Sequence, residues 1–168
     1  MIEIPKELMQ NLLVFSCSGM ECAFSLEAVR EIVPMARLSS PPGLPAALAG
    51  FLDLRGTAIP IIHLDRLFQL PEQLRGLHTP MIILRGVDGP IGVLVESVRG
   101  IVPVTSARLL LIPDDGTFQG CATATLDLDG DLVHLLSPAA LLAANENRLV
   151  AGYTATSQER LQLLEGTI

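Results

Sequence analysis

The sequence predicts an all-β chain with a few short helices, folded as two small barrels that are related by an internal duplication. Short apolar and β-branched runs recur along the chain with glycine-containing turns between them, a pattern typical of strands joined by hairpins. Two segments of the first half also recur, in the same order, in the second half. A repeated unit of about five short strands favours closed barrels, because closure removes exposed sheet edges.

The first repeated unit covers about residues 12–70. It begins with a β-rich run at 12–17, and the Ser-Gly pair at 18–19 predicts a turn into the next strand. A later strand pair surrounds the Arg-Gly turn at 55–56. A short helix is expected to begin at Asp65.

The second unit covers about residues 80–144 and is expected to be interleaved with the first at their boundary. Its β-rich run at 81–87 leads into the Asp-Gly pair at 88–89, which is a strong hairpin signal. Another hairpin is predicted through the Asp-Gly pair at 129–130. The Ser-Pro pair at 137–138 then predicts a helix start, with Ser as N-cap and Pro as the first helical residue.

The repeat makes a specific structural prediction. Residues 29–33 should occupy the same place in the first barrel as residues 98–102 in the second. This follows because the matching segments lie in the same order and at nearly equal separations along the chain. The matches are Ala23–Pro34 with Gly92–Pro103, and Leu52–Phe68 with Leu126–Leu142.

Two charged positions differ between the repeats. Glu31 aligns with Gly100, and Arg55 aligns with Asp129. If their segments lie on adjacent strands, Glu31 and Arg55 could form a bidentate ion pair. The alternative is an ordinary surface salt bridge, worth less than about 1 kcal/mol.

Composition and charge restrict the class of partner. The chain has 168 residues, 49% of them hydrophobic but only 4% aromatic, so Leu, Ile, Val and Ala must build the core. A net charge of −7 argues against a nucleic-acid partner, since phosphate binding needs a basic face. No apolar run is long enough for a membrane span, and the N-terminus lacks the pattern of a signal peptide. We therefore expect a cytoplasmic protein without direct membrane insertion.

No residue pattern predicts catalysis. An enzyme needs a nucleophile with a base, paired carboxylates, a metal set or a phosphate-binding loop, and none of these is recognisable. The histidines lie far apart and in no metal-ligand frame. We therefore expect no enzyme activity, no metal and no cofactor. The histidines are His63, His78 and His134.

The three cysteines are expected to be free thiols. Cys17 and Cys22 flank a predicted turn and could face each other across the hairpin, whereas Cys121 stands alone. In a reducing compartment, buried cysteines act as small apolar side chains. No Cys-x-x-Cys pair exists that would indicate a zinc or redox site.

The stretch Ala49–Leu67 resembles the core motif of the CheW family, small scaffold proteins that couple bacterial chemoreceptors to the histidine kinase CheA. Here the motif reads as a strand-like run, the Arg-Gly turn at 55–56, an Ile-Pro strand, and His63-Leu64 before a helix. His63 departs from the family, which usually has Asp there. Further segments also fit, so that the resemblance covers about Leu12 to Ala144; they are Val29–Val33, Ile91–Val98, Gly120 and Asp129–Leu142.

The resemblance implies a CheW-like domain at residues 11–144, built from two SH3-like five-stranded barrels, and a C-terminal extension at 145–168. It implies a non-catalytic adaptor that binds the cytoplasmic tip of a chemoreceptor and the regulatory domain of a CheA-type kinase. The protein would be cytoplasmic and recruited to membrane receptor arrays. The receptor- or kinase-binding positions that it indicates are Val29, Glu31, Gly50, Arg55 and Gly56.

Two other functions remain open at this point. One is a CheV-like adaptor that works with a response regulator. The other is a small-molecule-binding or enzymatic double barrel, which a deep polar pocket with converging ionisable groups would favour. A flat apolar groove between the barrels would favour the scaffold instead.

The C-terminal extension contains a predicted helix. Residues 156–159 form a capping box, residues 160–165 an amphipathic turn and a half, and Gly166 a stop signal. Such a short helix would be marginal alone. It either folds back onto a barrel, which we favour, or engages a partner.

Overall fold

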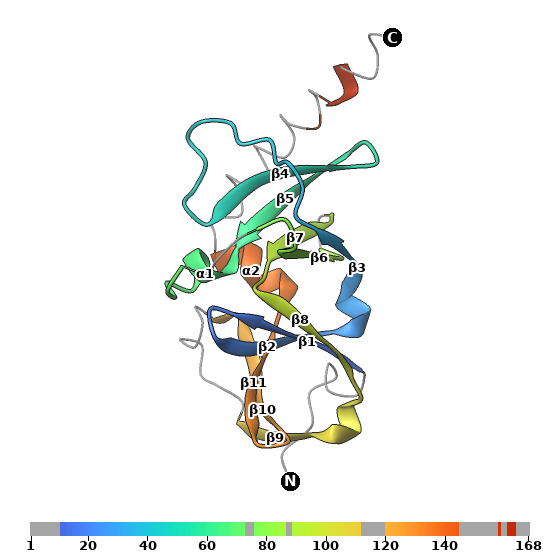
Figure 1. The fold of residues 1–168 in the computed structure, drawn as a ribbon, viewed down its shortest axis with the longest axis vertical. Helices are drawn as coiled ribbons and strands as arrows, with labels where there is room; N and C mark the ends of the chain where they lie inside the picture. Colours follow the sequence, from blue (N-terminus) through green and yellow to red (C-terminus); the bar gives the residue numbers. More distant parts are fainter. Residues whose placement is uncertain are drawn as a thin grey trace.

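The computed structural model describes residues 11–72, 76–86, 89–111, 120–144, 158 and 161–163. Within these residues the chain forms two mixed sheets connected by turns and short helices. Figure 1 shows the five-stranded sheet above the six-stranded sheet, with the helices α1 and α2 between them at mid-height. The predicted all-β class, with two subdomains and short helices, is confirmed.

The five-stranded sheet is built from the middle of the chain. Its strand order is β3-β6-β7-β5-β4. Neighbouring strands are antiparallel except for β5 and β7, which are parallel. The strands are β3 (Val29–Pro34), β4 (Leu48–Leu54), β5 (Thr57–His63), β6 (Pro80–Leu84) and β7 (Ile91–Leu94).

The six-stranded sheet combines the N-terminal hairpin with the second half of the chain. Its strand order is β8-β1-β2-β11-β10-β9. Here β2 and β11 form the parallel pair, and the other neighbours are antiparallel. The strands are β1 (Leu12–Cys17), β2 (Met20–Ser25), β8 (Ser97–Val102), β9 (Ala107–Leu111), β10 (Ala122–Leu128) and β11 (Asp131–Leu136).

The short helices follow corresponding strands of the two sheets. The hydroxyl of Ser137 accepts the N–H of Ala140 over 3.4 Å, and Pro138 is the first helical residue, as predicted. The α-helices are α1 (Leu64–Leu67), after β5, and α2 (Pro138–Ala144), after β11, and 3₁₀ turns at Leu26–Ala28 and Val104–Ser106 precede β3 and β9.

The two sheets share one plan, as the sequence repeat predicts. The strands β3, β6, β7, β5 and β4 of one sheet occupy the places of β8, β1, β2, β11 and β10 in the other. Even the irregularities correspond: the register shifts at Arg30 in β3 and at Arg99 in β8, and again at Ala49 in β4 and at Thr123 in β10. Bulges at matching positions indicate that the repeated segments occupy equivalent places.

The sheets nevertheless cross the expected subdomain limits. The N-terminal hairpin of β1 and β2 pairs with β8 and β11, whereas β6 and β7 pair with β3 and β5. Each sheet therefore takes one hairpin from the other sequence unit, and neither sheet coincides with residues 12–70 or 80–144. The parallel pairs explain why, because two parallel strands cannot be joined by a tight turn and must come from separate parts of the chain.

The strand β1 lies between two cores. Leu13, Phe15 and Cys17 belong to a cluster that both sheets share. Leu12 and Val14, on the opposite face, belong to a cluster within the six-stranded sheet. Because both faces are buried, the strand is a nearly continuous apolar run.

The shared cluster holds the two sheets together. It contains Phe24 of β2, Phe51 of β4 and Ile82 of β6, together with Leu64 of α1 and Leu141 of α2. All of these side chains are at most 2% exposed. Burial of this many large apolar side chains is the main force that fixes the arrangement of the two sheets.

The hairpin turns have the backbone that their sequences predict. In each of the described turns two successive residues have positive φ, as a two-residue type I′ turn requires. Asp88, of the predicted turn at 88–89, lies outside the described residues. The turn pairs are Ser18 (φ 50°) with Gly19 (φ 82°), Arg55 (φ 51°) with Gly56 (φ 85°), and Asp129 (φ 52°) with Gly130 (φ 92°).

The cysteines of the first hairpin are not directly opposed, which corrects one expectation. Cys17 lies opposite Met20, and Cys22 lies opposite Phe15. A turn of only two residues sets this register, so that the two thiols are diagonal neighbours on one face. Cys17, Cys22 and Cys121 are all free and buried in the shared cluster, as expected of apolar thiols.

Candidate protein-binding surface

An ion pair joins the end strands of the five-stranded sheet. Glu31 projects from β3, and Arg55 lies in the turn that follows β4. The Arg55 Nη2 donates to Glu31 Oε1 over 2.8 Å. Since β3 and β4 are the first and last strands of the order, the sheet must curl to bring these side chains together. The contact is a single hydrogen bond, whereas the sequence suggested a bidentate pair.

The two members of the pair differ in exposure. The Arg55 side chain is 67% exposed, whereas the Glu31 side chain is only 29% exposed. A pair this open to solvent contributes at most about 1 kcal/mol to stability. The carboxylate therefore orients a largely exposed guanidinium, whose further N–H donors suit an acidic or carbonyl group of a partner.

The turn that carries Arg55 is braced from within the hairpin. The carboxylate of Asp53 accepts the N–H of Gly56 over 3.0 Å. In the second hairpin, Asp127 accepts the N–H of Gly130 over 2.8 Å in the same way. The repeated Leu-Asp-Leu sequence is therefore explained by turn geometry, and it fixes the backbone on which Arg55 is displayed.

Gly50 is a buried position within β4. A Cβ atom there would lie 2.7 Å from the Ser39 carbonyl oxygen and 2.8 Å from the Ser40 hydroxyl. Its φ of 151° is also one that other residues rarely adopt. The glycine therefore allows the segment 38–40 to pack against the strand, where Ser39 and Phe51 exchange main-chain hydrogen bonds of 2.9 and 2.8 Å.

The remaining predicted positions, Val29 and Gly56, support the backbone that carries the Glu31–Arg55 ion pair. Val29 is half-buried and packs against the shared core. Gly56 completes the turn beside Arg55. Of the five residues indicated by the resemblance, Glu31 and Arg55 are therefore the ones that present charged groups at the surface.

Ile32, which follows Glu31 along β3, was not singled out from the sequence, yet it is 43% exposed. Its counterpart in the repeat, Ile101 on β8, is also exposed, at 59%. An isoleucine that is exposed in both copies of a strand does not serve the core. Successive side chains of a strand point to opposite faces, so Ile32 lies on the other face of β3 from Glu31 and is not part of the charged site.

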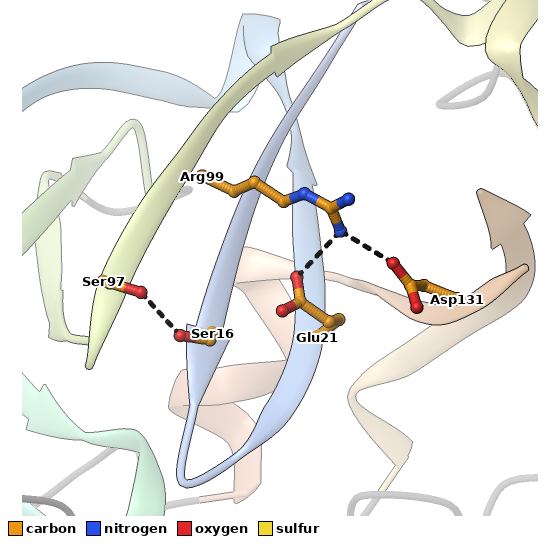
Figure 2. A network of polar contacts seen from close by, with 5 residues as sticks. All are labelled: Ser16, Glu21, Ser97, Arg99 and Asp131. Carbon is orange, nitrogen blue, oxygen red and sulfur yellow. Dashed lines mark hydrogen bonds and ion pairs between the residues drawn. The ribbon is translucent and has the colours of Figure 1, made fainter. Parts of the chain in front are cut away.

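The second sheet carries a different charge network. Figure 2 shows Arg99 on β8 reaching across β1 toward Glu21 on β2 and Asp131 on β11. The Arg99 Nη1 lies 3.6 Å from Glu21 Oε2 and 3.2 Å from Asp131 Oδ2.

A separate hydroxyl contact joins the strands β1 and β8. The side chains of Ser16 and Ser97 meet over 2.7 Å between β1 and β8. Gly100 and Asp129, the counterparts of Glu31 and Arg55, cannot form an equivalent pair because Gly100 has no side chain. The two sheets therefore present different surfaces on one plan.

Within the C-terminal extension, Gln158 contacts the hairpin that carries Arg55. Gln158 Nε2 donates to the Gly56 carbonyl over 2.8 Å, and its Oε1 accepts the Ala58 N–H over 2.8 Å. Gln158 and residues 161–163 are helical. The other capping-box residues, Thr156, Ser157 and Glu159, lie outside the described residues. The sequence gave no signal that Gln158 would contact this hairpin.

Burial shifts the proton affinity of the thiols and of one histidine. Burial raises the pKa of Cys17 and Cys22 to about 12 and that of Cys121 to about 11. It lowers the pKa of His134, which lies 3.4 Å from the Thr125 hydroxyl. A thiol that resists ionisation is a poor nucleophile and metal ligand.

The described residues contain neither a metal cluster nor a membrane-spanning helix. Among them, no group of three or more His, Cys, Asp or Glu side chains is placed to hold a metal ion. None of their helices has the length and apolar character of a membrane span. His63 is 7% exposed before α1, and its main-chain N–H donates to the Ala47 carbonyl over 2.7 Å.

Comparison with known proteins identifies relatives of both sequence and fold. The family model described as CheW-like domain matches residues 11–146. The chemotaxis protein CheW of Bacillus subtilis is 27% identical over 105 residues, which cover 62% of this chain and 67% of the relative. The probable chemotaxis protein CheW of Rhizobium etli is 27% identical over 141 residues, covering 82% and 90%.

A solved structure shows the same fold. The crystal structure of the scaffolding protein TtCheW from Thermoanaerobacter tengcongensis superposes with a TM-score of 0.71 at 20% identity. The match covers 79% of this chain and 92% of that protein.

Proposed function

Because this chain belongs to the CheW-like domain family of chemotaxis scaffold proteins, which are not enzymes, we propose that it couples methyl-accepting chemoreceptors to a CheA-type histidine kinase. One partner is the cytoplasmic tip of the receptor, a long helical hairpin. The other is the regulatory domain of the kinase. The protein works in the cytoplasm and is recruited to receptor arrays at the membrane.

The observation that carries this proposal is the ion pair between Glu31 and Arg55. It offers an oriented cation that is 67% exposed on a braced turn. A cation of this kind contributes little to folding. Arginines that are held in place at an interface are among the residues that contribute most to binding.

The five indicated residues then have two kinds of role. Glu31 and Arg55 contact the partner directly. Val29, Gly50 and Gly56 position these side chains. Val29 anchors β3 to the shared core, Gly50 lets the segment 38–40 pack against β4, and Gly56 shapes the turn.

The two partners differ in the surface they need. The resemblance implies that the receptor hairpin places its apolar stripe in a groove between the barrels. The kinase regulatory domain is itself a double barrel in this family, and it packs barrel end against barrel end. Each protein partner is therefore tested separately.

Titration calorimetry tests the proposal. The full chain is titrated with a soluble receptor tip and, separately, with the kinase regulatory domain, both from the organism that encodes it. We expect each to bind and all three to form one complex. Kinase activity in vesicles that contain the receptor should then require this chain.

A negative result is equally clear. If the chain binds neither the receptor tip nor the kinase domain at physiological salt, the coupling function is wrong. Binding to only one of them would show that the protein acts on that partner alone and does not couple the two. A fluorescent fusion that stays diffuse in cells with intact arrays would contradict its recruitment to the membrane.

A further inference from the structure

In each of the described two-residue turns, a carboxylate accepts the main-chain N–H of the turn glycine. Two of these acids lie three residues before the glycine in the same hairpin, whereas the third lies in the connection between β7 and β8. Because the same contact recurs with acids of different origin, it serves the turn itself. The pairs are Asp53 with Gly56 over 3.0 Å, Asp127 with Gly130 over 2.8 Å, and Glu96 with Gly19 over 3.1 Å.

Arg55 occupies a turn position that favours other residues. The first central residue of a type I′ turn needs a positive φ, which Asn, Asp and Gly adopt most readily. The second hairpin follows this rule, with Asp129 at a φ of 52°. Arg55 has almost the same φ, 51°, although its Cβ makes the left-handed conformation unfavourable. Contacts from neighbouring groups must therefore hold the arginine in this conformation.

Asp53 makes such a contact at the backbone of the turn. It is an exposed residue of β4, paired across the hairpin with Ala58. Its Oδ1 accepts the N–H of Gly56 and so encloses the main chain of Arg55 between the two ends of the contact. The guanidinium of Arg55 is held separately by Glu31. Arg55 is thus fixed at its backbone by one acid and at the end of its side chain by another.

We propose that Asp53 is a positioning residue for partner binding, which holds Arg55 in the left-handed turn conformation that directs its guanidinium to Glu31 and to the partner. Asp53 acts through Arg55 and does not touch the partner. This inference rests on the proposed adaptor function and assigns a further residue to the same site. A side chain that is ordered before docking binds more tightly, because less conformational entropy is lost on association.

Titration of full-length variants tests the role of Asp53. Asp53→Ala removes the acceptor, whereas Asp53→Asn keeps a carbonyl oxygen that can accept the same N–H. Asp127→Ala is the matched control, because it removes the same contact from the second hairpin. With the receptor tip or the kinase regulatory domain, whichever docks at Arg55, Asp53→Ala should bind about threefold to tenfold more weakly, as expected for the loss of one hydrogen bond. Asp53→Asn should bind like the wild type, and so should Asp127→Ala.

Two further measurements separate positioning from a general effect on the fold. Asp53→Ala is also made in the Arg55→Ala background, where it should cause no further loss of affinity, because a residue that acts through Arg55 has nothing left to position. Amide exchange is measured without any partner. The Gly56 amide should exchange about threefold to tenfold faster in Asp53→Ala, with the Gly130 amide of the intact second hairpin as the internal reference.

The outcomes distinguish the two claims. Unchanged Gly56 exchange, or unchanged affinity, in Asp53→Ala would overturn the positioning role. An equal loss of affinity with and without Arg55 would also overturn it, as would an Asp53→Asn variant that binds as weakly as Asp53→Ala. If neither the wild type nor any variant binds a partner, the adaptor function fails and the positioning role fails with it, while the exchange of Gly56 still shows whether Asp53 holds the turn.

Discussion

The guanidinium of Arg55 lies 2.8 Å from the carboxylate of Glu31 and thereby links the two end strands of the five-stranded sheet. The link spans a gap that no main-chain ladder fills, since β3 and β4 are not neighbours in the strand order. A contact at this position is suited to fix the surface ends of β3 and β4 relative to each other. Its exposure makes it a weak contributor to folding.

The first prediction separates binding from stability at Arg55. Arg55→Ala should lower the free energy of unfolding by no more than about 1 kcal/mol. Receptor or kinase binding should lose about 2 kcal/mol or more, as at interface arginines that contribute strongly. Urea unfolding and calorimetric titration measure the two quantities.

Arg108→Ala is the matched control, because Arg108 forms a 3.0 Å ion pair with Asp127 and is 75% exposed on the other sheet. It should leave binding unchanged. Normal binding of both partners by Arg55→Ala at physiological salt would rule out this site.

The second prediction concerns the polarity of the pair. The double variant Glu31→Arg with Arg55→Glu should fold almost as stably as the wild type, because the two charges still attract. Binding should remain impaired, since the partner meets the opposite charge where it expects a guanidinium. Recovery of full affinity in the double variant would mean that the partner does not recognise either charge.

The third prediction concerns Gly50. Gly50→Ala should cost about 2 kcal/mol or more in stability, because the new methyl group collides with the Ser39 carbonyl and the backbone φ is unfavourable. Thermal unfolding provides the measurement. Gly76→Ala is the control, since a Cβ atom added there would meet nothing within 4 Å and its φ is ordinary; equal losses in both variants would contradict the packing argument.

The fourth prediction concerns the free thiols. Reductant should not change the melting temperature, because Cys17, Cys22 and Cys121 form no disulfide in the native fold. Alkylating reagents should modify them only on unfolding, since all three are buried. A large fall in melting temperature after addition of reductant would instead reveal a structural disulfide.

The fifth prediction concerns alkaline pH. Burial raises the pKa of Cys17 and Cys22 from 9.0 to about 12, so that above about pH 9 the thiols ionise in the unfolded chain before they do so in the folded protein. The associated stability is complete below pH 9 and is lost as the pH rises toward 12. Urea midpoints measured from about pH 8 to 11 should fall, and Cys22→Ala should fall less steeply. An identical slope in that variant would exclude the thiol as a cause.

Local features were predictable because they depend on neighbouring residues. The strand at 12–17, the turns at 18–19, 55–56 and 129–130, and the cap at Ser137 each follow from side chains a few positions apart. Backbone conformation and capping are short-range effects. The resemblance to the CheW family also came from residues read in order, and the comparisons confirm it.

The candidate site was only partly predictable. Differences between the repeats drew attention to Glu31 and Arg55, and the structure brings them together. Their partner-binding role stays a prediction. The exposure of Ile32 and the position of Gln158 could not be read from the chain, since each depends on what lies across the fold.

By itself, the sequence determined the all-β class, the duplicated plan and the positions of the turns, because these are set by local geometry and by a pattern that occurs twice. Only the tertiary structure decided which hairpin joins which sheet. The N-terminal hairpin pairs with β8 and β11, and β6 and β7 fill the corresponding places between β3 and β5. An apolar strand can pair with many other strands. The position of the N-terminal hairpin is set by the burial of both faces of β1 between two cores. This burial exists only once the whole chain has packed.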